Sequence, residues 1–249
     1  MRDAWSDLVL GSSCAGCGAP GRLVCRRCAA ALPRAGRAAR PSPCPAGLVP
    51  TFAAGVYDGM LRALVLGHKE RGQLAAGRAL GVLLAVAVRT LLAQGAGPGA
   101  VPGATVVVLV PVPSQRATVR ARGVDATTRM TRAGARELRR GGGTVVVLPL
   151  LAVRRGTRDQ GGLTSTERAA NLRGRMWVRP RPRDRLTRLG PVRVVLCDDV
   201  VTTGSTLREA QRALERSGVP VAGAATVAAT VRRRVGSRPA GLPLPRSAD

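Results

Sequence analysis

The stretch VVLCDDVVTTGST, Val194 to Thr206, decides the fold that this chain is expected to adopt. Its apolar residues predict a buried strand that runs into two adjacent carboxylates, Asp198 and Asp199. A turn of small hydroxyl residues follows, and the residues after it predict a helix. Because neighbouring carboxylates repel each other, a strand that ends on them is more easily explained by a ligand than by packing.

The turn after the two acids has the composition of a phosphate site. Free backbone N–H groups at a helix N-terminus, together with the positive end of the helix dipole, attract an anion. Hydroxyl side chains add donors, and Gly204 lets the backbone approach a ligand closely. The carboxylates just upstream can accept hydrogen bonds from a vicinal diol, so the stretch predicts a sugar-phosphate site. An N-cap cluster beside solvated acids is the alternative, and no Walker A sequence is present. The predicted binding residues are Asp198, Asp199, Thr202, Thr203, Gly204, Ser205 and Thr206.

The rest of the chain predicts an α/β fold. Runs of β-branched residues alternate with helical patterns, which favours a mostly parallel, twisted sheet with helices on both faces. Ligands of such sheets bind at the carboxyl ends of the strands, where the two acids are expected. The expected strands are 51–57, 105–110, 144–148, 192–197 and 221–231. The expected helices are 60–66, 73–92, 125–139 and 206–217, with a break at 67–72 and a long loop with a helical end over 153–172.

Four of the six cysteines form the pattern CAGC-x7-CRRC: Cys14, Cys17, Cys25 and Cys28. Two CxxC pairs at this distance are typical of a tetrahedral thiolate zinc site. A pair of disulfides, or chance, is the alternative, but disulfides are disfavoured in a reducing compartment. Four thiolates close the coordination sphere of the metal, so the predicted zinc is structural.

These patterns divide the chain into four parts. Residues 1–32 are predicted to form a zinc-ribbon-like module, and residues 33–49, rich in Pro, Arg and Ala, a linker. Residues 50–231 carry the α/β domain. The Arg- and Pro-rich tail 232–249 is predicted to be disordered.

The composition limits the choice of partners. The chain has 249 residues, a formal net charge of +26 and 45% hydrophobic residues, which is enough for a core. Among its 40 basic residues only Lys69 is a lysine, a skew that a GC-rich genome explains. The charge attracts polyanions, so both nucleic acid and a polyphosphate ligand fit it. No targeting segment is evident, and the longest apolar stretch, 79–88, is shorter than the ~20 residues that span a bilayer, which predicts a cytoplasmic protein.

The stretch 194–206 resembles the phosphoribosyl pyrophosphate (PRPP) motif of type I phosphoribosyltransferases at all 13 positions. The resemblance implies a type I phosphoribosyltransferase-like fold, in which the acids hold the ribose hydroxyls and the turn holds the 5′-phosphate. Purine salvage enzymes often carry an acid at the first turn position, where this chain has Thr202. The resemblance therefore does not favour purine salvage.

A narrower resemblance covers nearly the whole chain. A double-CxxC module before a PRPP-binding domain is similar to the ComF family, which is named for DNA uptake in competent bacteria. The segment VPVPSQRATVRARG (110–123) is similar to the Pro-x-Pro, Arg-rich stretch of that family. The segment RRGTRDQGGLTSTERAANLRG (154–174) is similar to its flexible loop. The family usually continues Arg-Gly with Phe-Asn-Gln, whereas residues 124–126 here are Val, Asp and Ala.

The chemistry of PRPP transfer and the family resemblance together indicate the remaining site residues. Transfer from PRPP forms an oxocarbenium-like sugar as pyrophosphate leaves, so the site needs Mg²⁺, basic groups and a lid that excludes water. Lys69, next to His68, is a candidate for the pyrophosphate side, because a single lysine indicates that a point charge is needed there. A solvated helix end is the alternative for Lys69. The candidates on the lid are Arg155, Gln160, Leu163, Arg168 and Asn171, of which Arg155, Gln160 and Arg168 are expected to be catalytic with Lys69. A solvated face or a nucleic-acid contact is the alternative for this Arg-rich loop. The arginines expected on the pyrophosphate side are Arg116, Arg120 and Arg122.

Two functions follow from these residues. The first is Mg²⁺-dependent transfer of phosphoribosyl to an unidentified acceptor, a glycosyltransferase reaction. The second is a non-catalytic PRPP-, nucleotide- or single-stranded DNA-binding protein of the ComF type, which the zinc module and the basic surface favour. Weak nucleic-acid binding and no membrane span are expected, and a homodimer is left open. The aromatic residues available to stack bases are few: Trp5, Phe52, Tyr57 and Trp177.

Overall fold

The computed structural model describes residues 13–70, 74–95, 103, 105–113, 125–154 and 174–231. The strands of its central sheet are β1 (Arg37–Ala38), β2 (Thr51–Val56), β8 (Gly223–Ala229), β7 (Val192–Val201), β3 (Val106–Pro111) and β4 (Val145–Val147), in that spatial order. Neighbouring strands pair in parallel, except that β1 is antiparallel to β2. A separate antiparallel ribbon pairs β5 (Leu151–Val153) with β6 (Met176–Val178).

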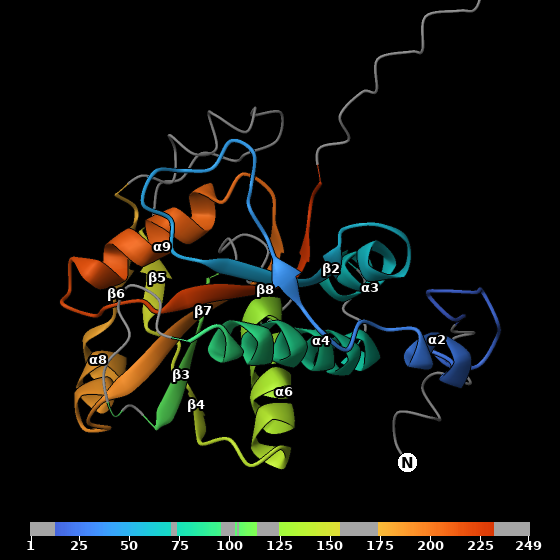
Figure 1. Cartoon of the computed structure of the whole chain (residues 1–249), viewed down its shortest axis with the longest axis horizontal. Helices are drawn as coiled ribbons and strands as arrows, with labels where there is room; N and C mark the ends of the chain where they lie inside the picture. The colour runs from blue at the N-terminus through green and yellow to red at the C-terminus, as the bar shows by residue number, and fades with distance from the viewer. Residues whose placement is uncertain are drawn as a thin grey trace, which may run out of the picture.

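Helices cover both faces of the central sheet. Figure 1 shows α4 and α6 together on one side and α9 on the other, with α2 and α3 at one end. The helices are α2 (Arg26–Ala30), α3 (Gly59–Glu70), α4 (Leu74–Ala93), α6 (Ala126–Arg140), α8 (Pro180–Thr187) and α9 (Ser205–Glu215). The predicted α/β architecture, a mostly parallel sheet between helices, is confirmed.

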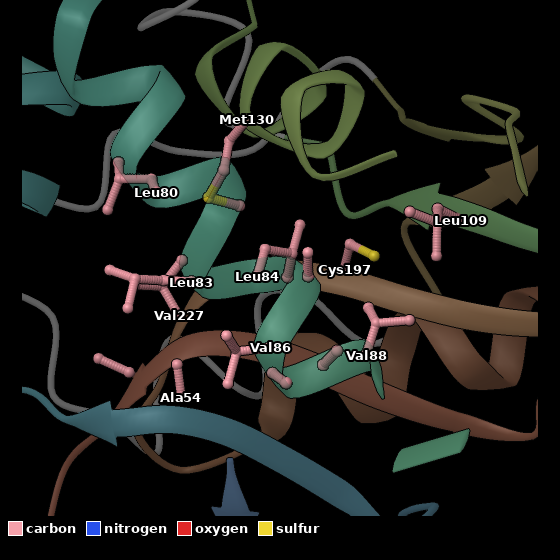
Figure 2. Packing of buried hydrophobic residues seen from close by; sticks show 14 of the residues in the cluster. Ala54, Leu80, Leu83, Leu84, Val86, Val88, Leu109, Met130, Cys197 and Val227 are labelled. Atoms are coloured by element: carbon pink, nitrogen blue, oxygen red, sulfur yellow. The ribbon is translucent and has the colours of Figure 1, made fainter. Parts of the chain in front are cut away.

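Apolar side chains fill the face of the sheet under α4 and α6. Leu83 and Leu84 of α4 have no exposed surface and share one buried cluster with Met130 of α6 and Cys197 of β7 (Figure 2). By length and composition alone, the segment Ala76–Ala93 could cross a membrane, but 61% of it is buried inside the protein. α4 therefore packs as the central core helix of this face.

The opposite face packs against α9 and the β5–β6 ribbon. Leu207 and Leu214 of α9 share a second buried cluster with Val194 and Leu196 of β7. Val195 of β7 belongs instead to the cluster under α4. Adjacent side chains of β7 therefore point to opposite faces of the sheet, as extended strands require.

The predicted helix break after residue 66 is wrong. α3 continues through Gly67, His68 and Lys69 to Glu70. Gly67 and His68 are buried, and the packing of this last turn outweighs the helix penalty of roughly 1 kcal/mol for a glycine. The extra turn carries Lys69 towards the carboxyl end of the sheet.

β7 is longer than predicted. It continues past Cys197 to Val201, so both acids lie inside the strand, near its carboxyl end, rather than after it. The pairing with β8 explains the extension, because Asp198 faces Thr226 in the parallel register and Val200 faces Ala228. Backbone hydrogen bonds to a neighbouring strand can hold polar residues in a β-sheet. The side chains of these residues alone would not predict a strand there.

Three structured regions have no clear signal in the sequence. The strands of the β5–β6 ribbon are three residues long, too short to show a period. α8 is rich in Arg and Pro, and Pro180 stands at its start, where a helix tolerates proline. Residues 33–49, predicted to be a linker, contain β1, and residues 46–49 form hydrogen bonds with α9. The proposed tail 232–249 lies outside the described residues.

Candidate functional site

Asp198 and Asp199 lie near the carboxyl end of β7, between β8 and β3. The N–H of Asp199 donates to Oδ1 of Asp198 (2.9 Å), and the N–H of Val200 donates to Oδ1 of Asp199 (2.7 Å). Asp199 is buried and Asp198 is half-buried. Each carboxylate is therefore oriented by a backbone N–H and keeps its second oxygen for another partner.

Lys69 brings a cation to this acid pair from the last turn of α3. Its Nζ lies 2.5 Å from Oδ2 of Asp199. The Lys69 side chain is 46% exposed, whereas that of Asp199 is 8% exposed, so the ammonium reaches both protein and solvent. Partial burial alone would lower the pKa of Lys69, but the charges of Asp199 and Asp198 outweigh it and raise the pKa. Lys69 is therefore protonated at neutral pH.

Asp198 holds a proton more tightly than an ordinary carboxyl group. The surrounding protein and then the charge of Asp199 raise its pKa to about 8, and the charge of Lys69 offsets only part of this rise. At neutral pH Asp198 is therefore mostly protonated. A ligand that brings further positive charge favours loss of the proton from Asp198.

Gly204 shapes the turn between β7 and α9. Its φ of 71° lies in the left-handed region, and it is the N-cap of α9 without any side-chain cap. Oγ1 of Thr203 and Oγ of Ser205 lie 3.0 Å apart in a hydrogen bond. Thr202 is exposed and Thr206 is half-buried. An uncapped helix N-terminus surrounded by hydroxyl groups can bind a phosphate.

His68 anchors the turn of α3 that carries Lys69. It is 5% exposed, and its Nε2 lies 3.0 Å from the carbonyl oxygen of Ala126 at the start of α6. The ring also packs on α4, where a β carbon at Gly77 would come within 3.1 Å of its Cε1. These contacts of His68 hold the last turn of α3, which carries Lys69, against α4 and α6.

Some predicted site residues lie outside the described residues: Arg116, Arg120, Arg122, Arg155, Gln160, Leu163, Arg168 and Asn171. The described residues show where their segments join the fold. The N–H of Val112 donates to the carbonyl of Cys197 (2.9 Å), directly before Asp198. The N–H of Arg154 donates to the carbonyl of Arg175 (2.9 Å) at the end of the β5–β6 ribbon. One segment therefore leaves the sheet next to the acids, and the other leaves from the ribbon.

α9 carries two buried polar side chains that the sequence analysis does not single out, Glu209 and Gln211. Glu209 is 4% exposed, and its carboxylate accepts hydrogen bonds from the N–H of Met176 (3.0 Å) and from the guanidinium of Arg212 (2.6 and 2.8 Å). Gln211 is 3% exposed and forms hydrogen bonds with the backbone of residues 47 and 49. The helix that follows the turn thus also holds the ribbon and the N-terminal segment.

The four CxxC cysteines converge in the N-terminal module. Their sulfur atoms all lie within 4.8 Å of one another, and those of Cys17 and Cys25 are 3.7 Å apart. Tetrahedral zinc with Zn–S bonds of about 2.3 Å needs sulfur atoms about 3.8 Å apart. All six cysteines of the chain are free thiols. The cluster can therefore bind a metal such as zinc.

Protons are unevenly shared within this cluster. Hydrogen bonding by the backbone of Cys25 and Cys17 lowers the pKa of Cys14 to about 6. Side-chain hydrogen bonds with Cys14, Cys25 and Cys17 raise the pKa of Cys28 to about 12. Cys14 is therefore a thiolate at neutral pH, and a divalent cation would favour loss of the proton of Cys28.

The region that holds the acids and the turn is similar to a known domain. A family model described as the phosphoribosyl transferase domain matches residues 135–240. No curated protein matches the chain. The matched region begins within α6 and includes β7, α9 and β8, whereas Lys69 and the four cysteines precede it. With the parallel sheet and the cysteine cluster, this match confirms the predicted fold class, a phosphoribosyltransferase-like domain with a small N-terminal cysteine module.

Proposed function

We propose that this protein transfers the phosphoribosyl group of Mg²⁺-bound PRPP to an acceptor that is still to be identified. The observation that carries the proposal is the acid pair of β7, which leads directly into an uncapped, left-handed turn at the start of α9. Carboxylates accept hydrogen bonds from ribose hydroxyls, and such a turn accepts a phosphate. The phosphoribosyl transferase domain over residues 135–240 supports binding of PRPP or a related ribose phosphate.

Two fixed points orient the sugar. Asp198 and Asp199 bind the ribose hydroxyls at the carboxyl end of β7. The 5′-phosphate lies in the turn, where the first N–H groups of α9 and the neighbouring hydroxyls donate to it. The residues of the turn are Thr202, Thr203, Gly204, Ser205 and Thr206. With both ends of the ribose 5-phosphate held, the C1 carbon is presented to the acceptor in one orientation.

The reaction exchanges one bond at C1. The bond between C1 and the pyrophosphate oxygen breaks, pyrophosphate leaves with the electron pair, and the nucleophilic atom of the acceptor bonds to C1. Lys69 faces the leaving group, because its ammonium lies beside the acids and is half exposed. Such a charge stabilises the pyrophosphate as it departs. By resemblance to the ComF family, Arg116, Arg120 and Arg122 add positive charge there, and Arg155, Gln160 and Arg168 belong to a lid.

The acid pair also fits the Mg²⁺ that accompanies PRPP. Mg²⁺ prefers oxygen ligands, and it usually combines one or two carboxylates with phosphate oxygens and water. Asp198 and Asp199 would hold the ion from the protein side. Bound Mg²⁺ supplies charge neutralisation for the pyrophosphate. The raised pKa of Asp198, about 8, predicts that loading with Mg²⁺–PRPP releases a proton near neutral pH.

Thermal unfolding with Mg²⁺ and PRPP tests the proposal. Ligand at 100 times its Kd stabilises a protein by about 2.7 kcal/mol, so we expect a clear rise in Tm. The rise should be lost in Asp198→Ala and Asp199→Ala and kept in Asp184→Ala, an exposed acid of α8. A screen of nucleophiles for pyrophosphate release then identifies the acceptor. If Mg²⁺–PRPP leaves Tm and the two site variants unaffected, the proposal is wrong.

We also propose that the cysteine cluster binds structural zinc. The separations of the sulfur atoms match a tetrahedral ion, and four thiolates leave no open position for catalysis. Elemental analysis of the purified protein should find one zinc per chain, and Cys14→Ser should lose it, whereas Cys44→Ser, an exposed cysteine outside the cluster, should not. Metal-free protein from the wild type would contradict this assignment. A cytoplasmic location and a homodimer stay predictions.

A second function, binding of nucleotides or single-stranded DNA without catalysis, is favoured by one surface. Among the described residues, Trp177 of β6 is one of two exposed large apolar side chains and is 37% exposed. The chain after it carries exposed arginines, none of which forms an ion pair with another described residue. These are Arg179, Arg181, Arg183, Arg185 and Arg188. A base can stack on an indole while arginines bind the phosphates.

Salt titrations of single-stranded DNA binding test this second function. Counterion release predicts that affinity falls steeply as salt rises, and Trp177→Ala should weaken binding without changing the salt slope. Affinity that stays flat from low to high salt would exclude it. A role in DNA uptake rests on the ComF resemblance and needs a test in cells.

A further inference from the structure

A segment before β2 lies against the turn and α9. We call residues 41–49 the strap. The N–H of Val49 donates to Oε1 of Gln211 (3.0 Å), and Nε2 of Gln211 donates to the carbonyl of Gly47 (2.9 Å). Nε of Arg208 donates to the carbonyl of Ala46 (3.0 Å). α9 therefore holds the strap by three hydrogen bonds.

Gln211 is the buried centre of this contact. Its side chain is 3% exposed, and besides its two bonds to the strap its Nε2 donates to Oε1 of Glu215 (2.7 Å). The carboxamide accepts on one side and donates on the other, so only one orientation satisfies both strap groups. The bond from Val49 is buried, and a buried N–H without a partner would destabilise the fold, so this bond favours one register of the strap along α9.

The strap touches the turn at Gly204. A β carbon at Gly204 would lie 2.9 Å from Cδ2 of Leu48 and 2.9 Å from Cγ of Pro41. It would also lie 3.3 Å from Cδ of Pro45. Gly204 is buried, and its carbonyl accepts the first bond of α9 from the N–H of Arg208 (2.9 Å). The strap therefore forms an apolar wall behind the turn, and the same helix end fixes both.

We propose that Gln211 is a positioning residue for the phosphate turn and acts through the strap. The inference rests on the proposed function for its ligand, a ribose 5-phosphate group. A phosphate binds only when the N–H groups of the turn converge, so any loosening of the wall lowers the population of the binding conformation. Gln211 touches neither substrate nor reacting atoms. It keeps Leu48 against Gly204, which keeps the left-handed turn in place.

Binding of two halves of PRPP separates positioning from general stability. Calorimetry at a temperature well below unfolding should give an affinity for ribose 5-phosphate on the order of tenfold weaker in Gln211→Ala, because fewer molecules hold the turn ready. Affinity for Mg²⁺–pyrophosphate, which does not use the turn, should stay unchanged. Leu48→Ala keeps all bonds of Gln211 and should show the same selective loss if Gln211→Ala fails to fold. Gln94→Ala, at an exposed position just after α4, is the matched control and should bind both ligands like the wild type.

Equal loss for both ligands, or no loss for ribose 5-phosphate, would overturn the inference. A ligand-free measurement keeps it testable if the wild type binds neither ligand, in which case the proposed function fails by itself. The amide of Arg208, bonded to Gly204, should exchange with solvent about tenfold faster in Gln211→Ala and Leu48→Ala than in Gln94→Ala, since it reports opening of the turn. Unchanged exchange in both variants would show that the strap does not position the turn.

Discussion

Two helices on opposite faces of the sheet, α4 and α9, stabilise the protein in different ways. α4 buries apolar carbon, and Leu80, Leu83 and Leu84 have no exposed surface (Figure 2). α9 also buries Glu209 and Gln211, and each of these has hydrogen-bond partners from a distant part of the chain. α4 therefore stabilises the fold mainly by burying apolar surface. α9 buries apolar surface too, and its hydrogen bonds also fix the positions of the segments packed against it.

The difference separates stability from positioning. Hydrophobic contact is non-directional, whereas a buried hydrogen bond requires one geometry. α9 holds the strap, the β5–β6 ribbon and the turn, and the turn follows the acid pair directly. We therefore expect changes inside α4 to lower stability without altering ligand affinity. Changes to the polar groups of α9 should alter both.

Glu209→Ala should give the largest loss of stability. It leaves the N–H of Met176 and the guanidinium of Arg212 without their buried partner, so the free energy of unfolding should fall by about 4 kcal/mol. Burial alone would raise the pKa of Glu209, but its bonds to Arg212 and to backbone N–H groups lower it below 4.5. The stabilisation is therefore complete above pH ~4.5 and is lost as the pH falls through the lowered pKa.

Urea unfolding at pH 7 and at low pH measures this effect, and Glu215→Ala is its control. The Glu215 side chain is 42% exposed, and its ion pair with Arg208 should contribute less than about 1 kcal/mol. Equal losses of stability in the two variants at pH 7 would mean that the buried hydrogen bonds of Glu209 contribute no more than an exposed ion pair. The proposed difference between α4 and α9 would then be wrong.

Leu83→Ala should lower the free energy of unfolding by about 3 kcal/mol, because the site has no exposed surface and leaves a cavity. The affinity of the folded protein for Mg²⁺–PRPP should not change. Leu92→Ala, at a half-buried position of the same helix, should lose less stability. A weaker affinity in Leu83→Ala, measured well below its Tm, would show that α4 also positions the site.

The sequence predicts the acids and the turn because they form one continuous segment. Residues 194–206 contain a buried strand, two carboxylates and a glycine turn in direct succession. Because they are neighbours in the chain, they lie together in the fold without any long-range contact. Lys69 needs more, since the last turn of α3 brings it to Asp199 from a distant part of the chain. A single lysine among arginines marks Lys69 as unusual, but nothing in the sequence names its partner.

Sequence patterns do not predict the buried contacts of Glu209, Gln211 and the strap. Hydrophobic periodicity marks the buried face of a helix by its apolar residues, so a polar residue on that face looks like an interruption. The strap has the Pro-, Arg- and Ala-rich composition of a linker, and its order comes from bonds to α9. The long strands and helices, in contrast, show a clear period, and their existence follows from the sequence to within a few residues at each end.

Asp198→Asn tests a polar group of β7 that is expected to destabilise the fold when it is ionised. Asp198 is half-buried near the carboxyl end of β7, next to Asp199 and near the charge of Lys69. Its pKa is raised from 3.8 to about 8, so its contribution to stability is greatest below pH ~3.8 and declines as the pH rises to about 8. Asparagine cannot ionise, so the variant should be more stable than the wild type at pH 8.

The gain in Asp198→Asn should shrink as the pH is lowered and vanish near pH 4, which a series of urea unfolding curves can measure. Binding of Mg²⁺–PRPP should be lost over the same range. Asp184→Asn, an exposed acid of α8, should show neither effect. A variant that is less stable than the wild type at pH 8 would mean that Asp198 is retained for packing rather than for a ligand.

Thr90→Val should give the smallest effect. Thr90 is a polar tie at the end of α4: its Oγ1 accepts from the N–H of Gly36 (2.9 Å) and donates to the carbonyl of Val86 (3.1 Å). Valine keeps the shape and removes both bonds, so urea unfolding should show a loss of about 1 kcal/mol. The control is Thr187→Val, which removes the bond from an exposed hydroxyl to the carbonyl of Asp184 and should lose less stability.

Affinity for ribose 5-phosphate should stay unchanged in Thr90→Val, because Gly36 precedes the strap and does not contact the turn. If that affinity falls as it does in Gln211→Ala, hydrogen bonds elsewhere on the N-terminal segment also position the turn. The positioning would then not be specific to the polar side chains of α9.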